Sequence, residues 1–129
     1  MINRVQWSTG AAVGADGVAT STGYSVAVRG KVLAVHVAYL LTPPAATTDF
    51  TLSDEDDPAA ESIITLVNAA TDIKIYPRRA TQTNANAALL YAAAGTPVSE
   101  PYVIHGRLKA TIAQANALDY CTVTVWIER

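Results

Sequence analysis

A chain of 129 residues, of which 50% are hydrophobic and 16% charged, is long enough for one domain with its own core and too apolar for the disordered class. Its net charge of −2 argues against a strongly basic face of the kind that binds nucleic acid. No apolar run reaches the ~18 residues of a membrane span, and the first residues lack the order of a secretory signal. The single cysteine excludes an intrachain disulfide. Together these features lead us to expect a soluble chain made in a reducing compartment.

The first half of the chain predicts short strands separated by turn signals. Residues 2–7 form the first strand, and residues 8–22, rich in Gly, Ala, Ser and Thr, are typical of a flexible loop or an extended arm. Residues 24–29 alternate between apolar and polar positions, and Gly30-Lys31 predicts a tight turn into a second alternating strand over residues 32–41. Thr42-Pro-Pro44 ends that strand, because proline removes a ladder donor.

The middle of the chain continues the pattern and then loses it. Residues 49–53 predict a short strand, and residues 62–67 and 71–76 predict a strand pair joined at residues 68–70. The pattern fades between Pro77 and Pro101, where a short helix, an extra strand and a long loop all stay open.

The last part of the chain has the clearest two-residue period. Strands are predicted over residues 101–105, 106–113 and 120–127. In the final strand Tyr120 and Trp126 face outward, and four residues face the core: Cys121, Val123, Val125 and Ile127. With roughly eight to ten short strands and little helix, the whole chain, residues 1–129, is predicted to be one all-β domain, an antiparallel sandwich or barrel. Cys121 is interpreted as a small buried hydrophobe and not as a reactive thiol.

The acidic loop, residues 54–57, is the sharpest polar feature, with Asp49 and Glu61 nearby. Carboxylates at this spacing can supply the oxygen ligands of Ca²⁺, but the glycine bend and the far ligand of an EF-hand are missing. We therefore predict a solvated turn and no metal site, with ion binding as the alternative.

No set of residues forms a catalytic constellation. His36 and His105 have no zinc-ligand spacing around them, and the chain has no Gly-x-Ser-x-Gly elbow. Residues 10–14 resemble a phosphate-binding loop only superficially, because the lysine and the following helix are absent. We therefore predict no enzyme activity, no catalytic residue and no cofactor.

Four side chains are candidates for contact with a partner. Arg78 and Arg79 follow a predicted strand and could grip a carboxylate or a phosphate, although a solvated strand end is the alternative. Tyr102 and Trp126, together with Trp7, are predicted to be exposed aromatics that could stack on sugars or pack against another chain. Strands that are apolar on both faces indicate that a copy of the same chain covers one face.

Four segments carry a resemblance to a known class of proteins: GKVLAVHVAY (residues 30–39), ESIITL (61–66), TDIKIYPR (71–78) and GRLKATIAQAN (106–116). Over residues 29–128 the chain resembles the capsid decoration, or cement, proteins of tailed bacteriophages and related small virion structural proteins. The resemblance implies a jelly-roll-like β-sandwich, often trimeric, with residues 8–22 as an N-terminal arm.

The function that the resemblance implies is structural. The protein would be made in the host cytoplasm, bind the outside of the capsid and cement neighbouring subunits of the major capsid protein. Its partners would be that protein and its own copies, as a homotrimer, with no nucleic acid and no membrane. Two alternatives stay open: a tail, head-fibre or receptor-binding component of the virion, and a carbohydrate-binding β-sandwich module.

Overall fold

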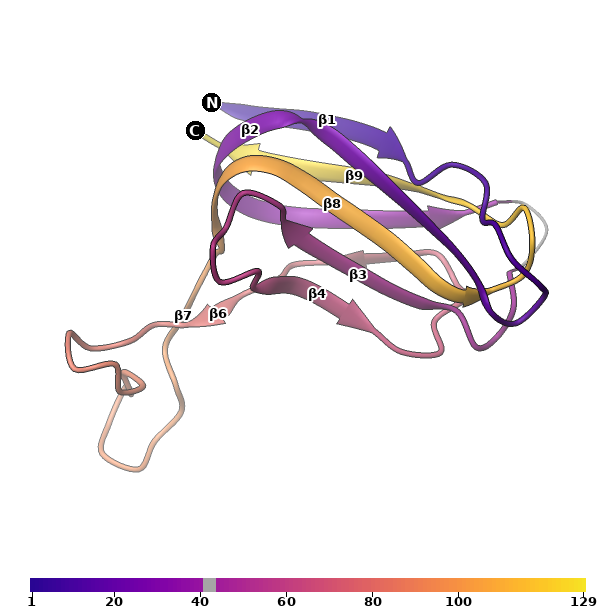
Figure 1. Cartoon of the computed structure of the whole chain (residues 1–129). Helices are drawn as coiled ribbons and strands as arrows, with labels where there is room; N and C mark the ends of the chain where they lie inside the picture. The colour runs from indigo at the N-terminus through magenta and orange to yellow at the C-terminus, as the bar shows by residue number, and fades with distance from the viewer. Residues whose placement is uncertain (41–43) are drawn as a thin grey trace.

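The computed structural model describes residues 1–40 and 44–129 and is all-β in this part of the chain (Figure 1). Its strands, in chain order, are β1 (Ile2–Ser8), β2 (Ala19–Tyr39), β3 (Asp49–Asp54), β4 (Ser62–Leu66), β5 (Ile73–Ile75), β6 (Arg79–Ala80), β7 (Ser99–Glu100), β8 (Val103–Ala115) and β9 (Cys121–Glu128). All their pairings are antiparallel, and the predicted β-sandwich is confirmed. The predicted strand end at Leu41 and the first part of the stop at Thr42-Pro-Pro44 lie outside the described residues. None of the described segments is a helix that could cross a membrane.

The sandwich has two layers, and the long strand β2 contributes to both. In one layer β1, β9, the second half of β2 and β5 lie side by side. In the other layer the first half of β2 lies beside β8, which is followed by β3 and β4. Both layers therefore belong to one seven-stranded sheet folded over on itself. A jelly roll has two separate sheets, so the jelly-roll-like topology holds only in the general sense of two antiparallel layers.

The predicted tight turn at Gly30-Lys31 is wrong, because β2 bends there without reversing. Gly30 has a φ of +136°, and a Cβ at this position would overlap the carbonyl oxygen of Glu128. Lys31 pairs with Val103 of β8 and with Glu128 of β9, so the strand passes directly from one layer to the other. The glycine provides the unusual backbone conformation and the close approach that this bend needs.

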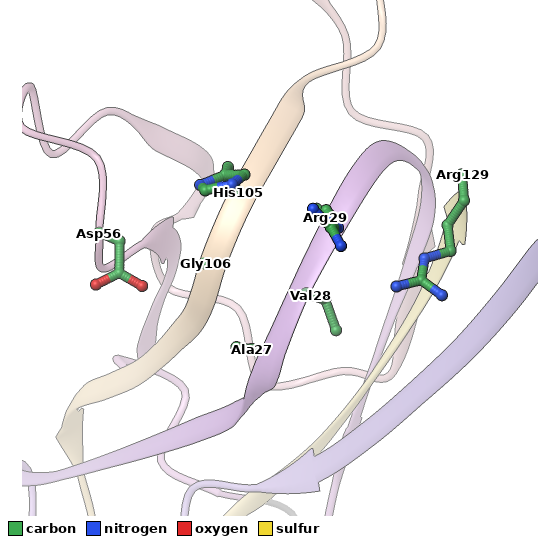
Figure 2. A pocket seen from close by; sticks show the side chains of 7 residues that line it. All are labelled: Ala27, Val28, Arg29, Asp56, His105, Gly106 and Arg129. Carbon is green, nitrogen blue, oxygen red and sulfur yellow. The ribbon is translucent and has the colours of Figure 1, made fainter.

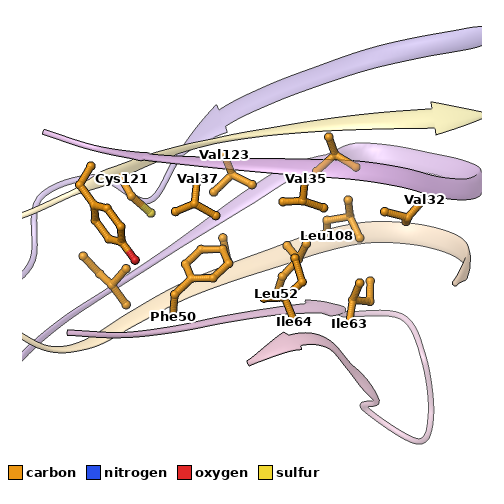
Figure 3. Packing of buried hydrophobic residues seen from close by; sticks show 14 of the residues in the cluster. Val32, Val35, Val37, Phe50, Leu52, Ile63, Ile64, Leu108, Cys121 and Val123 are labelled. Carbon is orange, nitrogen blue, oxygen red and sulfur yellow. The ribbon is translucent and has the colours of Figure 1, made fainter. Parts of the chain in front are cut away.

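The core lies between the two layers (Figure 3). The two-residue period places a row of apolar side chains inside the first layer, where Val35 pairs with both Val125 and Ile75. Phe50, which is fully buried, projects into the same core from β3. The predicted inward face of the last strand is confirmed, since its four side chains are at most 2% exposed: Cys121, Val123, Val125 and Ile127.

The segment predicted to be a flexible loop or arm, residues 8–22, is held against the body at several points, although Val13 and Val18 are exposed, and residues 19–22 already belong to β2. Ala12 and Ala19 are 1% and 0% exposed. The amide of Ala12 donates to the carbonyl of Asp119 at 2.7 Å, and that of Gly17 donates to the carbonyl of Ala115 at 2.9 Å. The small side chains of Ala12 and Ala19 allow close packing here. A composition rich in small residues is found in flexible loops as well, so it could not predict this packing.

The predicted pairing of residues 62–67 with residues 71–76 is also wrong. β4 pairs with β3, whereas β5 pairs with β2 in the other layer, so the chain between them crosses the end of the sandwich. Two carboxylates fix this crossing: Asp49 accepts a hydrogen bond from the amide of Asn68 at 3.0 Å, and Asp72 accepts one from the amide of Tyr39 at 2.8 Å.

The region that the sequence left open projects from the body as an arm, which we define as residues 79–100. It begins with β6, ends with β7 and extends away from both layers (Figure 1). Inside the arm the amide of Thr81 donates to the carbonyl of Val98, and the amide of Val98 donates to the carbonyl of Leu89, both at 2.9 Å. The arm is thus an irregular hairpin and has no helix.

Candidate functional site

The acidic loop, residues 54–57, is an exposed turn at Glu55 and Asp56, as predicted, and its carboxylates are in addition docked on the neighbouring strand β8. The carboxylate of Asp54 accepts a hydrogen bond from the amide of His105 at 2.9 Å, and that of Asp56 accepts one from the amide of Arg107 at 3.0 Å. These side chains continue the ladder along β8 beyond the point where β3 ends. Gly106 leaves the space for this, since a Cβ there would overlap the Asp56 carboxylate.

The other charged residues of the acidic loop also bind groups of the same chain. Glu55 forms an ion pair with Arg107, and the guanidinium of Arg107 also lies 4.1 Å from the ring centroid of Tyr24. Asp57 accepts hydrogen bonds from the amides of Ala59 and Glu61. Among the described residues no cluster of His, Cys, Asp and Glu is arranged to hold a metal ion.

The most deeply buried ionisable groups are Cys121 and Tyr39, and both face the core. Burial raises the pKa of the Cys121 thiol to about 11, although a hydrogen bond with Thr9 lowers it in part. Burial is also the main cause that raises the pKa of Tyr39 to about 12, with smaller contributions from Cys121 and Asp72. Both groups are neutral at physiological pH, so neither is prepared for nucleophilic or proton-transfer chemistry.

These two pKa values predict a loss of stability in alkali. Both groups are neutral when protonated and ionise more easily in the unfolded chain, so their contribution is complete below the unfolded pKa values of 9.0 and 10.0. The contribution is lost as the pH rises through about 11 for Cys121 and about 12 for Tyr39. Denaturant titrations at pH 8 and pH 11 should show a lower free energy of unfolding at pH 11, and Cys121→Ala should reduce the difference. A thiol that reacts with Ellman's reagent in the native protein as fast as in urea would contradict the burial.

The two histidines lie on the outer faces, as predicted. His36 pairs with Thr124 of β9 and with Lys74 of β5, and its side chain is half-buried. His105 is exposed on β8. The two are on different layers and do not form a joint site.

Three of the four predicted contact residues come together beside residues 32–34 of β2, at the base of the arm. Arg78 donates to the carbonyl of Leu33 at 3.2 Å, and the carbonyl of Tyr102 accepts the amide of Val32 at 2.9 Å. Trp126 pairs with Ala34.

The fourth residue, Arg79, lies at the root of the arm, where it pairs with Glu100 across β6 and β7. Its Nη2 donates to Gln82 at 3.4 Å, and its Nε is buried with no hydrogen-bond partner among the described residues.

The predicted exposure of the aromatic residues needs correction. Trp7 and Tyr102 are half-buried and pack against the core, and the indole N–H of Trp7 donates to the carbonyl of Gly23 at 3.2 Å. Trp126 does face outward, but the ammonium of Lys74 covers it at 4.4 Å from the ring centroid. The same ammonium lies 5.6 Å from the ring of Tyr76, a 61%-exposed residue that sequence reasoning did not select.

The arm is the feature of the surface that most resembles a docking element. Residues 80–99 include no Asp, Glu, Lys or Arg. No side chain in this stretch is buried. Leu89 and Tyr91 are 41% and 76% exposed. An uncharged segment that exposes apolar side chains to water is typical of a surface that another protein covers.

A second feature is a basic hollow beside the bend of β2 (Figure 2). It has a volume of about 520 Å³ and is lined by side chains from β2, β8, the acidic loop and the last residue: Ala27, Val28, Arg29, Asp56, His105, Gly106 and Arg129. A neighbouring hollow of about 300 Å³ shares four of these residues and adds Arg4. Sequence reasoning missed this group, because the register of three separate strands brings its arginines together.

The fold and these two features define an antiparallel β-sandwich with a docked acidic loop and an uncharged arm. No family model and no curated protein matches the sequence. Among solved structures, the fold is similar to the crystal structure of FLHE, with a TM-score of 0.51 and 14% sequence identity over 99% of this chain and 98% of that chain. At this identity the likeness is one of fold.

Proposed function

We propose that this chain is a non-enzymatic structural protein of a phage virion, which binds the outside of the capsid and cements neighbouring subunits of the major capsid protein. It is made in the host cytoplasm and associates with copies of itself, as a trimer, on the capsid surface. The proposal combines the sequence resemblance over residues 29–128 with the arm.

The arm is the observation that carries the proposal. Ordering a protein segment costs about 1–2 kcal/mol per residue in backbone entropy, which is normally offset by burial of apolar surface. Residues 80–99 have no buried side chain in the isolated chain, so the offset has to come from a partner. A protein whose role is to hold subunits together needs a contact element of this kind and no chemistry.

The surface around the base of the arm extends the contact area. Tyr76 is 61% exposed, and it lies next to the pair formed by Lys74 and Trp126. Aromatic residues supply much of the binding energy in protein interfaces, and arginine does the same. Arg78, also exposed, stands at the same base.

The test of this function is the copy number of the chain in purified particles. We expect a ratio near one-to-one with the major capsid protein, or a fixed simple fraction of it, when dissociated particles are quantified by mass spectrometry with labelled standards. A handful of copies per particle would contradict the capsid location in favour of a tail or portal component. Absence from the particles would overturn the virion role, and glycan arrays would then test the carbohydrate-binding alternative.

A further inference from the structure

The two adjoining hollows beside the bend of β2 form one continuous basic groove, which we define by Arg4, Arg29, Arg129 and His105. The hollows share Arg29 and Arg129, and Figure 2 shows Arg29 on β2 between His105 of β8 and Arg129 at the end of β9. Ala27, which has no side chain beyond Cβ, leaves the floor open, and the Asp56 carboxylate lies over Gly106 at one edge. The bend at Gly30 moves β2 from one layer to the other directly beside this floor.

The charge of this groove is only partly neutralised by the protein itself. Within residues 1–40 and 44–129 the ion pair formed is that of Arg107 with Glu55, and the three arginines of the groove take no part in it. Asp56 is the acidic residue among the lining side chains, and its carboxylate already accepts the amide of Arg107. The chain as a whole has a net charge of −2, so a local cluster of this sign is a specific feature and not a consequence of composition.

The backbone holds the two ends of the groove in place. Arg4 lies within β1 and pairs with Trp126 of β9. The amide of Arg129 donates to the carbonyl of Met1 at 3.0 Å, which extends the β1–β9 ladder to the last residue. The backbone positions of Arg4 and Arg129 are therefore fixed by the sheet, so binding has to order only their side chains.

We propose that this basic groove binds an acidic peptide segment of a partner protein, whose carboxylates pair with Arg29, Arg129 and Arg4. Guanidinium groups bind carboxylates through paired hydrogen bonds, and the three arginines are distributed over two adjoining hollows, which gives one extended chain several places to pair. A single small anion would contact only part of the groove. The proposal concerns the isolated chain and does not depend on the virion role.

The test uses the full chain and a hexaglutamate peptide, with hexaglutamine as the neutral control, in calorimetric and NMR titrations. We expect binding of hexaglutamate that weakens as salt is raised, with amide shifts at residues 27–29 and 105–106. The double variant Arg29→Ala/Arg129→Ala should weaken binding at least tenfold. Lys109→Ala, which removes one positive charge from a side chain outside the groove, should change it less than twofold.

Three outcomes would overturn the proposal. Pyrophosphate binding as tightly as hexaglutamate would show a simple oxyanion site, and tighter binding of a single-stranded oligonucleotide would show a nucleic-acid site. A loss of binding free energy in Lys109→Ala of half that in the double variant or more, which is an equal or larger loss per removed charge, would show non-specific attraction. The circular dichroism spectrum and melting temperature of each variant establish that it is folded, and Arg29→Lys/Arg129→Lys separates paired hydrogen bonding from charge, since it should keep only part of the affinity.

Discussion

Gly23→Ala is expected to lower the free energy of unfolding by about 3 kcal/mol and the melting temperature by about 10 °C. Gly23 lies in β2, where the end of β1 crosses it so closely that an added Cβ would overlap the carbonyl oxygen of Ser8 and lie 2.6 Å from the Cα of Thr9. The end of β1 cannot retreat, because the amide of Thr9 donates to the carbonyl of Cys121 at 3.0 Å and its hydroxyl accepts the amide of the same residue at 3.1 Å. Replacement of this glycine therefore displaces backbone and not a mobile side chain.

The control for this prediction is Gly17→Ala. Gly17 has a φ of +84°, but an added Cβ would meet nothing within 4 Å, so only the cost of the left-handed conformation, about 1 kcal/mol, is expected. Urea titrations of both variants at pH 7 measure the difference. Equal losses in the two variants would mean that β1 does not cross β2 at this distance.

The fold class could be predicted from the sequence because the strand period is a local signal. Cys121 to Ile127 alternate strictly, and the side chains predicted to face inward are buried. The same signal could not give the topology. β2 and the tight turn expected at Gly30 show why: a glycine with positive φ serves a hairpin or a bend equally well, and the choice depends on β9, whose Glu128 lies against it.

The acidic loop shows a second limit of sequence reasoning. Its composition is that of a solvated turn, and nothing near it in the chain indicates a partner. The partners of Asp54 and Asp56 are amides of β8, 51 residues away along the chain in each case. Contacts of this kind depend on strand register, which the local pattern does not determine.

The candidate site could be predicted only in part, because residue type is visible in the sequence and strand register is not. Arg78, Tyr102 and Trp126 were selected by residue type, and the structure brings all three beside one short stretch of β2. The arm was not recognised, because its residues have neither a helical nor a strand period, and a projecting segment leaves no core-facing pattern. The arginines of the basic groove were not selected either, since they are isolated in the sequence.

Removal of the arm is expected to separate folding from assembly. The variant deletes residues 81–98 and joins Ala80 to Ser99 through Asn-Gly, the sequence that favours a two-residue hairpin turn between β6 and β7. None of the deleted residues is buried, so the melting temperature should change by less than about 3 °C. Incorporation into particles should fall at least tenfold when the variant replaces the natural protein during particle production, as measured by the ratio of this chain to the major capsid protein.

A matched control sits at the opposite end of the sandwich, where Val13 and Val18 are 80% and 66% exposed in the loop before β2. The variant Val13→Ser/Val18→Ser removes exposed apolar surface of a similar kind without touching the arm, and it should be incorporated as well as the natural chain. Full incorporation of the arm-deleted variant would contradict the role of the arm, and loss in the control alone would assign docking to the loop end. If both variants lose incorporation while they remain folded, the loss is not specific to the arm, and the arm is not the element that alone docks the chain on the particle.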